Sequence, residues 1–241
     1  MVRAGDRLAG LILDALRASD FDLLDEDVLV IAQKIVSKAE GRLVRLEDVK
    51  PSDRAEELAR LTEKDPRLVE LILRESREVI RARPGLVIVE DTRGFVAANA
   101  GIDRSNVEQG EGDESVALLP TDPDASAELL RSDIREATGK EVAVIINDSH
   151  GRAWREGTVG VAIGVAGMSP LADRRGDTDL TGYVLQHTVI GLADEIASAA
   201  SLLMGPAAEG VPAVLVRGLH VNGREGSARE LQRPRELDLF R

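Results

Sequence analysis

The 241-residue sequence is 43% apolar but only 2% aromatic, so its core must be aliphatic, and no apolar run approaches the ~18 residues of a membrane helix. Its 31 Lys and Arg residues stand against 43 Asp and Glu residues, and the net charge of −12 argues against a non-specific nucleic-acid binder. Cysteine is absent, which excludes disulfides and thiolate metal sites, and without a signal-peptide pattern we expect a cytoplasmic protein with no membrane contact.

The first half of the chain predicts helices and short strands. Apolar residues at helical spacing from Leu8 to Leu16 predict an amphipathic helix, and VLVIA (Val28–Ala32) predicts a buried strand. Ser52 is expected to cap the first of two helices, which are predicted at residues 54–63 and 67–82. LVIVE then predicts a strand that forms a β-hairpin with FVAANAGID.

The second half predicts a long loop followed by further helices and strands. Residues 106–125 are acidic and rich in turn formers, which predicts a loop, and residues 126–138 predict a helix ended by Gly139. Strands are expected at residues 142–146, in TVGVAIGVAGMSPL and in AVLVRG, with a long helix over residues 187–204. The irregular alternation indicates a mixed α+β fold, and we expect a single domain over residues 1–241 that can divide into two subdomains.

Polar chemistry follows the predicted strand at residues 142–146, in the stretch NDSHGR. Asp148 and Ser149 place a carboxylate beside a hydroxyl, a combination that suits Mg²⁺ or Mn²⁺. The alternative is that Asp148 only caps a turn, and a turn-exposed position is expected for His150. Without HExxH or Gly-x-Ser-x-Gly, the sequence favours neither a zinc site nor a serine hydrolase.

Three further segments carry candidate ligand-binding groups. NAGIDRSN presents Asp103, Ser105 and Asn106, although an ordinary Asx turn is the favoured explanation of this segment taken alone. QKIVSKAEGR presents Lys34 and Lys38 after a strand, which indicates a local anion site or else a solvated basic turn, and it is not a Walker-type loop. The glycine-bounded loop MGPAAEGVP could approach a ligand closely or simply end a helix.

Taken together, these segments resemble the coenzyme F420-0:L-glutamate ligase family. The similar stretches, in chain order, are VSKAEGR, NAGIDRSNV, LLPTDPDASAELLR, VIINDSHGRAWREGTVGVAIGVAG, ADEIASAASLLMG and GVPAVLVRG. The resemblance implies mixed and antiparallel sheets with flanking helices, an intertwined homodimer and no C-terminal nitroreductase domain. It also implies a GTP-dependent ligase of coenzyme F420 biosynthesis, which joins L-glutamate to coenzyme F420-0 by γ-glutamyl amide bonds through an acyl phosphate.

The resemblance further implies a set of site residues. Two Mg²⁺ or Mn²⁺ ions, with K⁺ as an optional further ion, are expected at Asp103, Asp148 and Ser149. The expected GTP contacts are Gln33, Lys34, Lys38, Asn106, Met204, Gly205, Glu209, Gly210 and Val211. Asp103, Asp148 and Lys38 are the expected catalytic residues. From the residues themselves, Arg152 and Arg155 are candidates for binding a phosphate or carboxylate of the substrate.

The sequence departs from the family pattern at three places. Pro206 stands where relatives carry an acidic or amide metal ligand, so the second metal requires compensation by Glu209. Thr181-Gly182-Tyr183 replaces an expected Tyr-Gly-Arg, and the strand and Leu-Pro turn expected before RAGDRLAGLI are not in the sequence. Two alternatives therefore stay open: a metal-dependent phosphohydrolase, and a degenerate paralogue that binds nucleotide or deazaflavin without ligating.

Overall fold

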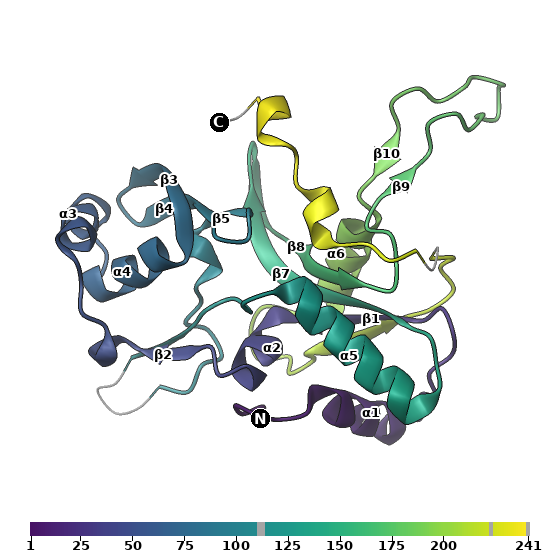
Figure 1. Cartoon of the computed structure of the whole chain (residues 1–241), viewed down its shortest axis with the longest axis horizontal. Helices are drawn as coiled ribbons and strands as arrows, with labels where there is room; N and C mark the ends of the chain where they lie inside the picture. The colour runs from purple at the N-terminus through teal and green to yellow at the C-terminus, as the bar shows by residue number, and fades with distance from the viewer. Residues whose placement is uncertain (110–113, 222–223, 240–241) are drawn as a thin grey trace.

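The computed structural model describes residues 1–109, 114–221 and 224–239, and a four-stranded sheet forms its centre (Figure 1). From one edge to the other, the strands are β11 (Ala213–Val216), β1 (Val28–Ala32), β7 (Ala143–Arg152) and β8 (Arg155–Ala166). β1 runs parallel to β7, whereas both outer pairs are antiparallel. This mixed sheet with its flanking helices confirms the predicted α+β class.

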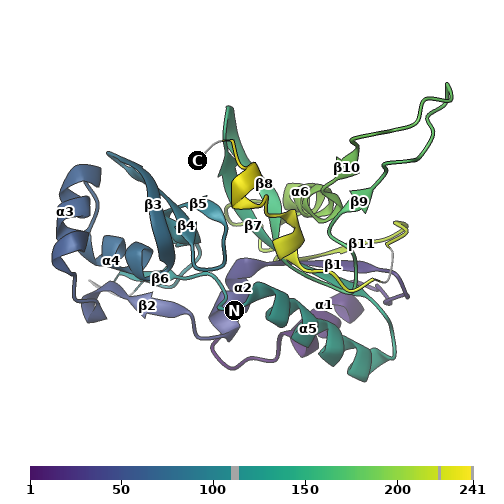
Figure 2. The same cartoon turned by 45° about the horizontal axis from the view of Figure 1, so that its top comes forward.

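Helices cover both faces of the central sheet because both faces are apolar. α1 (Leu8–Ala18) and α5 (Pro123–Thr138) lie on one face, and α6 (Leu192–Met204) lies on the other (Figure 2). Within β1, Leu29 and Ile31 join the core under α1 and α5, whereas Val28 and Val30 join the core under α6. Burial on both sides explains why this strand is an unbroken apolar run.

A smaller antiparallel sheet lies beside the first and carries its own helices (Figure 1). Its strands are β3 (Ser76–Arg83), β4 (Leu86–Asp91) and β5 (Val96–Ala98), and its helices are α3 (Asp53–Thr62) and α4 (Pro66–Arg74). The chain enters it through α2 (Gln33–Ala39), β2 (Leu43–Arg45) and the turn η1 (Leu46–Asp48), and leaves it through η2 (Asn99–Gly101) and β6 (Ser115–Ala117). β2 pairs with β6, so the two connections run side by side.

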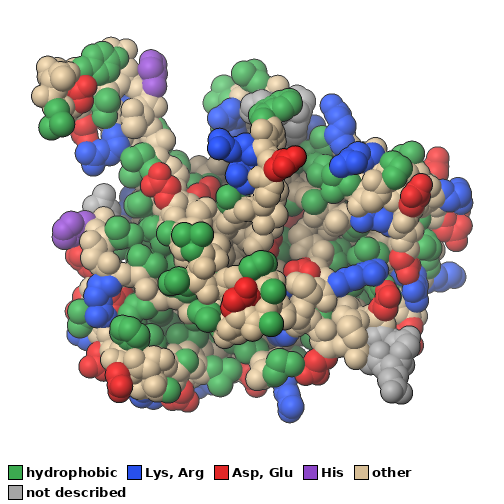
Figure 3. Space-filling view, turned by 180° about the vertical axis from the view of Figure 1, so that it is seen from behind, with side chains coloured by type: hydrophobic (Ala, Val, Ile, Leu, Met, Phe, Trp, Pro, Cys, Tyr) green, Lys and Arg blue, Asp and Glu red, His purple; other side chains and the backbone are tan. Residues whose placement is uncertain are grey.

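An arm stands away from the body, with β9 (Ala172–Asp173) and β10 (Val189–Ile190) at its base (Figures 1 and 3). The C-terminal segment, with the short turns η3 (Ala228–Leu231) and η4 (Arg235–Leu237), runs back beside β8. In the described ranges, no helix is both long and apolar enough to cross a membrane.

Local signals in the sequence set several boundaries correctly. Ser52 caps α3 by accepting a hydrogen bond from the backbone N–H of Ala55 at 3.3 Å. Gly139 ends α5 with a φ of +70°, a left-handed conformation that glycine adopts without steric cost. The hairpin predicted from LVIVE and FVAANAGID forms as β4 and β5.

Other predicted boundaries are wrong where strand pairing overrides helical pattern. The helix predicted at residues 67–82 ends at Arg74, because Ser76–Arg83 forms β3 against β4 with two register shifts. The helix predicted at residues 187–204 begins only at Leu192, because Val189–Ile190 pairs with β9.

The loop predicted at residues 106–125 is also shorter than expected. It contains β6, which pairs with β2, and the first turn of α5, which begins at Pro123 behind the cap Asp122. Residues 110–113 of this prediction lie outside the described residues.

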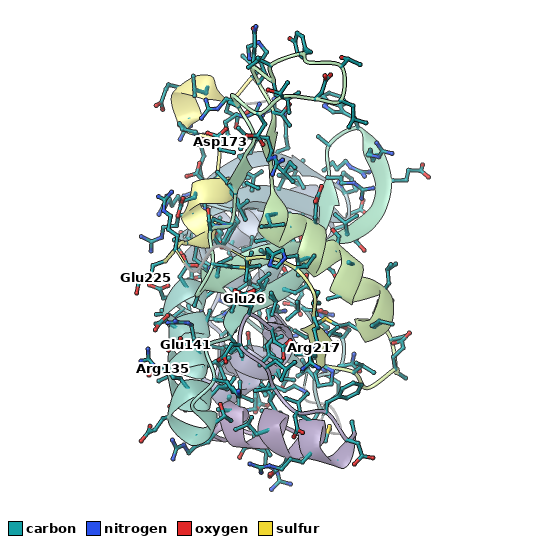
Figure 4. All side chains as sticks on the ribbon, turned by 90° about the vertical axis from the view of Figure 1, so that its right-hand side faces the viewer. Glu26, Arg135, Glu141, Asp173, Arg217 and Glu225 are labelled. Carbon is teal, nitrogen blue, oxygen red and sulfur yellow. The ribbon has the colours of Figure 1, made fainter. Side chains whose placement is uncertain are left out.

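The edge strand β11 is tied to β1 by an ion pair that should make stability depend on pH. Figure 4 labels Arg217, whose guanidinium lies 2.8 Å from both carboxylate oxygens of Asp27, a side chain only 1% exposed. Burial raises the pKa of Asp27, but the hydrogen bonds from Arg217 and the Leu24 N–H outweigh it and hold the pKa below its ordinary 3.8. The stabilisation should therefore be present above pH 3.8 and be lost as the pH falls through the lowered pKa.

We expect Arg217→Met to lower the free energy of unfolding by about 2 kcal/mol at pH 7, because it leaves a buried carboxylate unpaired. The difference from the wild type should shrink in urea melts as the pH falls below 3.8 and through the lowered pKa of Asp27. The control Arg174→Met removes an exposed pair with Asp177 and should change stability by less than about 0.5 kcal/mol. A loss for Arg217→Met that does not decrease as the pH is lowered would contradict the assignment.

Candidate functional site at the carboxyl ends of the central strands

Candidate residues from separate segments gather where β1 ends. Ala32, the last residue of β1, pairs with Asn147 of the parallel strand β7, so Gln33 and Asp148 follow at the same level of neighbouring strands. The Ala32 N–H donates to the Pro212 carbonyl at 2.8 Å, which brings the loop at residues 204–212 to the same edge. Ligand-binding groups commonly collect at such carboxyl ends because the sheet fixes their positions.

Lys34 pairs with Asp103 at this edge. Its ammonium lies 2.8 Å from Asp103 Oδ2 and donates to Ser105 Oγ at 2.5 Å. Burial raises the pKa of Asp103, but hydrogen bonds from Lys34 and from the Ser105 N–H oppose it, and the pKa is lowered overall. Asp103 is therefore ionised at neutral pH and already neutralised by a cation.

Lys38 lies one turn further along α2 and is buried. Its ammonium donates to the Asn106 carbonyl at 2.6 Å, while the Asn106 side chain donates to the Ala207 carbonyl at 3.0 Å. Burial and the nearby charge of Lys34 lower the pKa of Lys38, against a smaller opposing effect of Glu108. Two lysines that disfavour each other's charge form a site that an added anion would stabilise.

The loop after α6 completes this group of segments. Gly205 has a φ of +64°, and a Cβ atom there would meet the Glu209 side chain, so only glycine fits. Glu209 turns back onto its own loop and accepts a hydrogen bond from the Ala207 N–H at 2.8 Å. Met204 is buried at the end of α6, whereas Val211 is 40% exposed and Gly210 has a φ of +72°.

Asp148 and Ser149 lie within a strand, not at its end. β7 continues to Arg152 because its polar half pairs with β8 through the backbone, which does not require apolar side chains. The predicted end at residue 146 and the expected exposed turn at His150 are therefore wrong. Asp148 and His150 share one face of β7, while Ser149 lies on the other face and is exposed.

His150 is held between an aspartate and an aromatic ring. Its Nε2 lies 2.9 Å from Asp148 Oδ2, close enough for an ion pair although not aligned as a hydrogen bond, and its ring meets Phe95 edge-on at 6.4 Å. Burial lowers the pKa of His150, but the Asp148 carboxylate, with smaller effects of Asp91 and Asp194, raises it overall. Asp148 thus lies within ion-pair distance of a mostly buried histidine and favours the protonated form of that histidine.

The structure brings most predicted residues together but gives the two aspartates different partners. Asp103 pairs with Lys34 and Asp148 pairs with His150. Gln33 is buried and its side-chain oxygen accepts from Ser37, so its side chain faces the core. Phe95, Asp91 and Asp194 were not predicted as neighbours of His150, since nothing in their local sequence indicates that contact.

The donor set at this edge suits a hard cation but does not enclose one. Asp103, Asp148 and Ser149 offer only oxygen ligands, as Mg²⁺ prefers. Among the described residues, no three His, Cys, Asp or Glu side chains are grouped so that they could hold a metal ion. A cation here would therefore need ligands from a phosphate group or from water.

The fold and the site define a class: a mixed α+β protein that carries two lysines and two aspartates where its parallel central strands end. The chain belongs to the F420-0:gamma-glutamyl ligase family, whose model matches residues 1–218.

Relatives resemble the chain over its whole length. Proteins named coenzyme F420:L-glutamate ligase are 53% identical in Methanothermobacter thermautotrophicus, covering 100% of this chain and 95% of the relative, and 50% identical in Methanopyrus kandleri, covering 100% and 93%. The Archaeoglobus fulgidus protein of the same name is 48% identical and covers 100% and 92%. The predicted family is therefore confirmed.

Proposed function

We propose that the protein is a GTP-dependent ligase that adds L-glutamate to coenzyme F420-0 through γ-glutamyl amide bonds. The names of its relatives support the acceptor and the amino acid. The observation that carries the nucleotide part is the convergence of Lys34 and Lys38 with the segment from Asp103 to Asn106 and with the loop around Ala207. A cytoplasmic location, a single domain and bound K⁺ stay predictions.

The reaction would proceed in two steps. The terminal carboxylate of the acceptor attacks the γ-phosphorus of GTP, which forms an acyl phosphate and releases GDP. The amine of L-glutamate then attacks the acyl carbon, forms the amide and releases phosphate and a proton. Lys38, buried and next to Lys34, would supply positive charge to the triphosphate.

Divalent cations would complete the charge balance of the site. Asp103 and Asp148 would hold Mg²⁺ or Mn²⁺, and the ions would offset the charge of the bound triphosphate. The side chain of Ser149, expected as a further ligand, lies on the opposite face of β7 from Asp148 and would not share an ion with it. Glu209 could compensate for Pro206 at a second ion through the carboxylate oxygen that does not accept from the Ala207 N–H.

Lys34 should compete with a cation for Asp103, because its ammonium already contacts Oδ2 at 2.8 Å. We expect Lys34→Met to bind Mn²⁺ about tenfold more tightly without nucleotide, and to bind GTP about tenfold more weakly. Electron paramagnetic resonance of free Mn²⁺ and calorimetry with GTP would measure both affinities. Lys34→Arg, which keeps the charge, is the control, and weaker Mn²⁺ binding by Lys34→Met would refute the competition.

The proposed function is tested by mass spectrometry of purified protein with coenzyme F420-0, L-glutamate, GTP and Mn²⁺. The expected product is the acceptor with added glutamyl units, together with GDP and phosphate. GDP and phosphate without a glutamylated product would instead indicate the metal-dependent phosphohydrolase. Binding of GTP or deazaflavin with no turnover would indicate the degenerate paralogue.

We also propose a homodimer, supported by the arm between β9 and β10. This segment leaves the body while exposing Leu180, Tyr183 and Val184, apolar side chains that a second copy could cover (Figure 3). Light scattering coupled to size-exclusion chromatography should give twice the chain mass, and the double variant Leu180→Ser, Tyr183→Ser should shift it toward the monomer. A monomeric wild type would contradict this proposal.

A further inference from the structure

The only tryptophan of the chain stands exposed at the tip of the β7–β8 hairpin. Trp154 is 86% exposed and has a φ of +65°, a conformation that costs a bulky residue about 1 kcal/mol. Glycine or asparagine would form this turn without that cost. An unfavourable backbone that presents a large aromatic ring to solvent indicates that the ring itself has a use.

Two arginines flank this ring. Arg152 and Arg155 are directly paired across the hairpin, an arrangement of like charges that destabilises an isolated strand pair. Arg152 donates to the Gly157 carbonyl at 3.1 Å, and among the described residues neither guanidinium has a carboxylate within ion-pair distance. The tip thus combines an aromatic surface with uncompensated positive charge on an acidic protein.

The hairpin aligns this tip with the candidate active site. Asp148 and His150 occupy alternate positions of β7 and share one face, and Arg152 follows them past a register shift at the tip of the hairpin. Arg152 follows Asp148 by four residues and therefore lies about 13 Å from it along the strand, at ~3.3 Å per residue. Residues 151–158 are all exposed, and a Cβ atom added at Gly151 or Gly157 would meet nothing within 4 Å. The described chain therefore leaves room for a ligand at the tip, beyond the mostly buried side chains of Asp148 and His150.

We propose that Trp154, Arg152 and Arg155 bind the distal end of the acceptor: a planar heteroaromatic ring stacks on the indole, and an anionic linker pairs with the guanidinium groups. The assignment rests on the proposed function, in which coenzyme F420-0, a deazaflavin, reacts through its terminal carboxylate. With that carboxylate beside Asp148, an extended acceptor lies along β7 and its ring reaches the tip. Stacking and cation–π contacts are the interactions that such a ring offers.

Because Trp154 is the only tryptophan, its emission reports on this site without a label. Titration of the full chain with coenzyme F420-0, without GTP or glutamate, should quench this emission saturably. In turnover assays, Trp154→Gly and Arg155→Ala should each raise the KM for coenzyme F420-0 about tenfold and leave the KM for GTP within twofold. The glycine variant also relieves the positive φ, so loss of folding cannot explain its effect.

Matched controls come from exposed residues outside the hairpin. Phe21→Ala removes an aromatic ring that is 54% exposed after α1, and Arg54→Ala removes an exposed cation from α3. Both should leave the KM for coenzyme F420-0 unchanged.

The outcomes separate this inference from the proposed function. If the wild type ligates but the hairpin variants keep their KM, the inference is wrong and the proposed function stands. If no ligation occurs but coenzyme F420-0 quenches Trp154 and Arg155→Ala weakens that quenching, the binding site is supported and the proposed function fails. A change of oligomeric mass in the hairpin variants with an unchanged KM would identify the tip as an interface instead and overturn the inference.

Discussion

Replacement of Asp148 by alanine is expected to lower the rate of glutamate ligation about a thousandfold, because it removes a carboxylate from the centre of the candidate site. Asp148 lies beside the end of β1, faces the same side of β7 as His150 and contributes most to the raised pKa of that histidine. Its loss would remove the proposed cation ligand and also leave His150 without the carboxylate that lies 2.9 Å from its Nε2. The rate is measured as glutamylated product in single-turnover experiments with saturating GTP and Mn²⁺.

Two controls separate chemistry from folding. Asp133→Ala removes a carboxylate from the surface of α5, where its contact with Arg7 is 3.7 Å long, and should leave the rate unchanged. The melting temperature of Asp148→Ala should stay within a few degrees of the wild type, because the carboxylate lies at a partly exposed position outside the apolar cores. A ligation rate within tenfold of the wild-type rate would show that Asp148 is not a catalytic residue.

Arg93→Met is expected to lower the free energy of unfolding by about 3–5 kcal/mol, the largest stability effect anticipated outside the apolar cores. The Arg93 side chain is only 8% exposed and contacts Asp91 at 2.8 Å, Glu75 at 2.5 Å and the Pro120 carbonyl at 2.8 Å. Its removal leaves the Asp91 carboxylate, itself 1% exposed, without an ion pair. Removing one partner of a buried ion pair costs more free energy than the intact pair contributes, because the remaining charge stays desolvated.

Urea denaturation followed by circular dichroism measures this loss. Arg77→Met is the matched control, because Arg77 is 56% exposed and reaches Glu90 only at 3.4 Å, so a change below about 1 kcal/mol is expected. The double variant Arg93→Met, Asp91→Asn should recover part of the lost free energy of unfolding, because it also removes the unpaired buried charge of Asp91. If Arg93→Met lowered the free energy of unfolding by less than 1 kcal/mol, the buried ion pairs of Arg93 would contribute little to stability, against this prediction.

The Arg93 network also links the two parts of the molecule. Glu75, at the end of α4, accepts from Arg93 and from Arg42, which follows α2. The same β4–β5 turn carries Phe95, which packs on His150 beside Asp148. The smaller sheet therefore holds both the lysine-bearing helix and the Asp148 strand in position.

The sequence alone determined those features that depend on neighbouring residues. VLVIA is apolar on both faces and forms a buried strand, Ser52 supplies a cap to the helix that follows it, and Gly139 accepts the positive φ at the end of α5. Ordered motifs likewise identified the family and most of the candidate residues, because their residue types and order are written in the chain itself.

Only the tertiary structure decided which of these groups meet. Ser76–Arg83 forms a strand because its backbone pairs with β4. Likewise, β7 continues past Asn147 because its polar half pairs with β8. Lys38 meets the backbone of Asn106 across 68 positions, and Arg93 meets Glu75 across 18, in contacts that no local pattern encodes. Such pairings form only when distant segments pack together, since the gain from each contact must offset the entropy of bringing its segments into register.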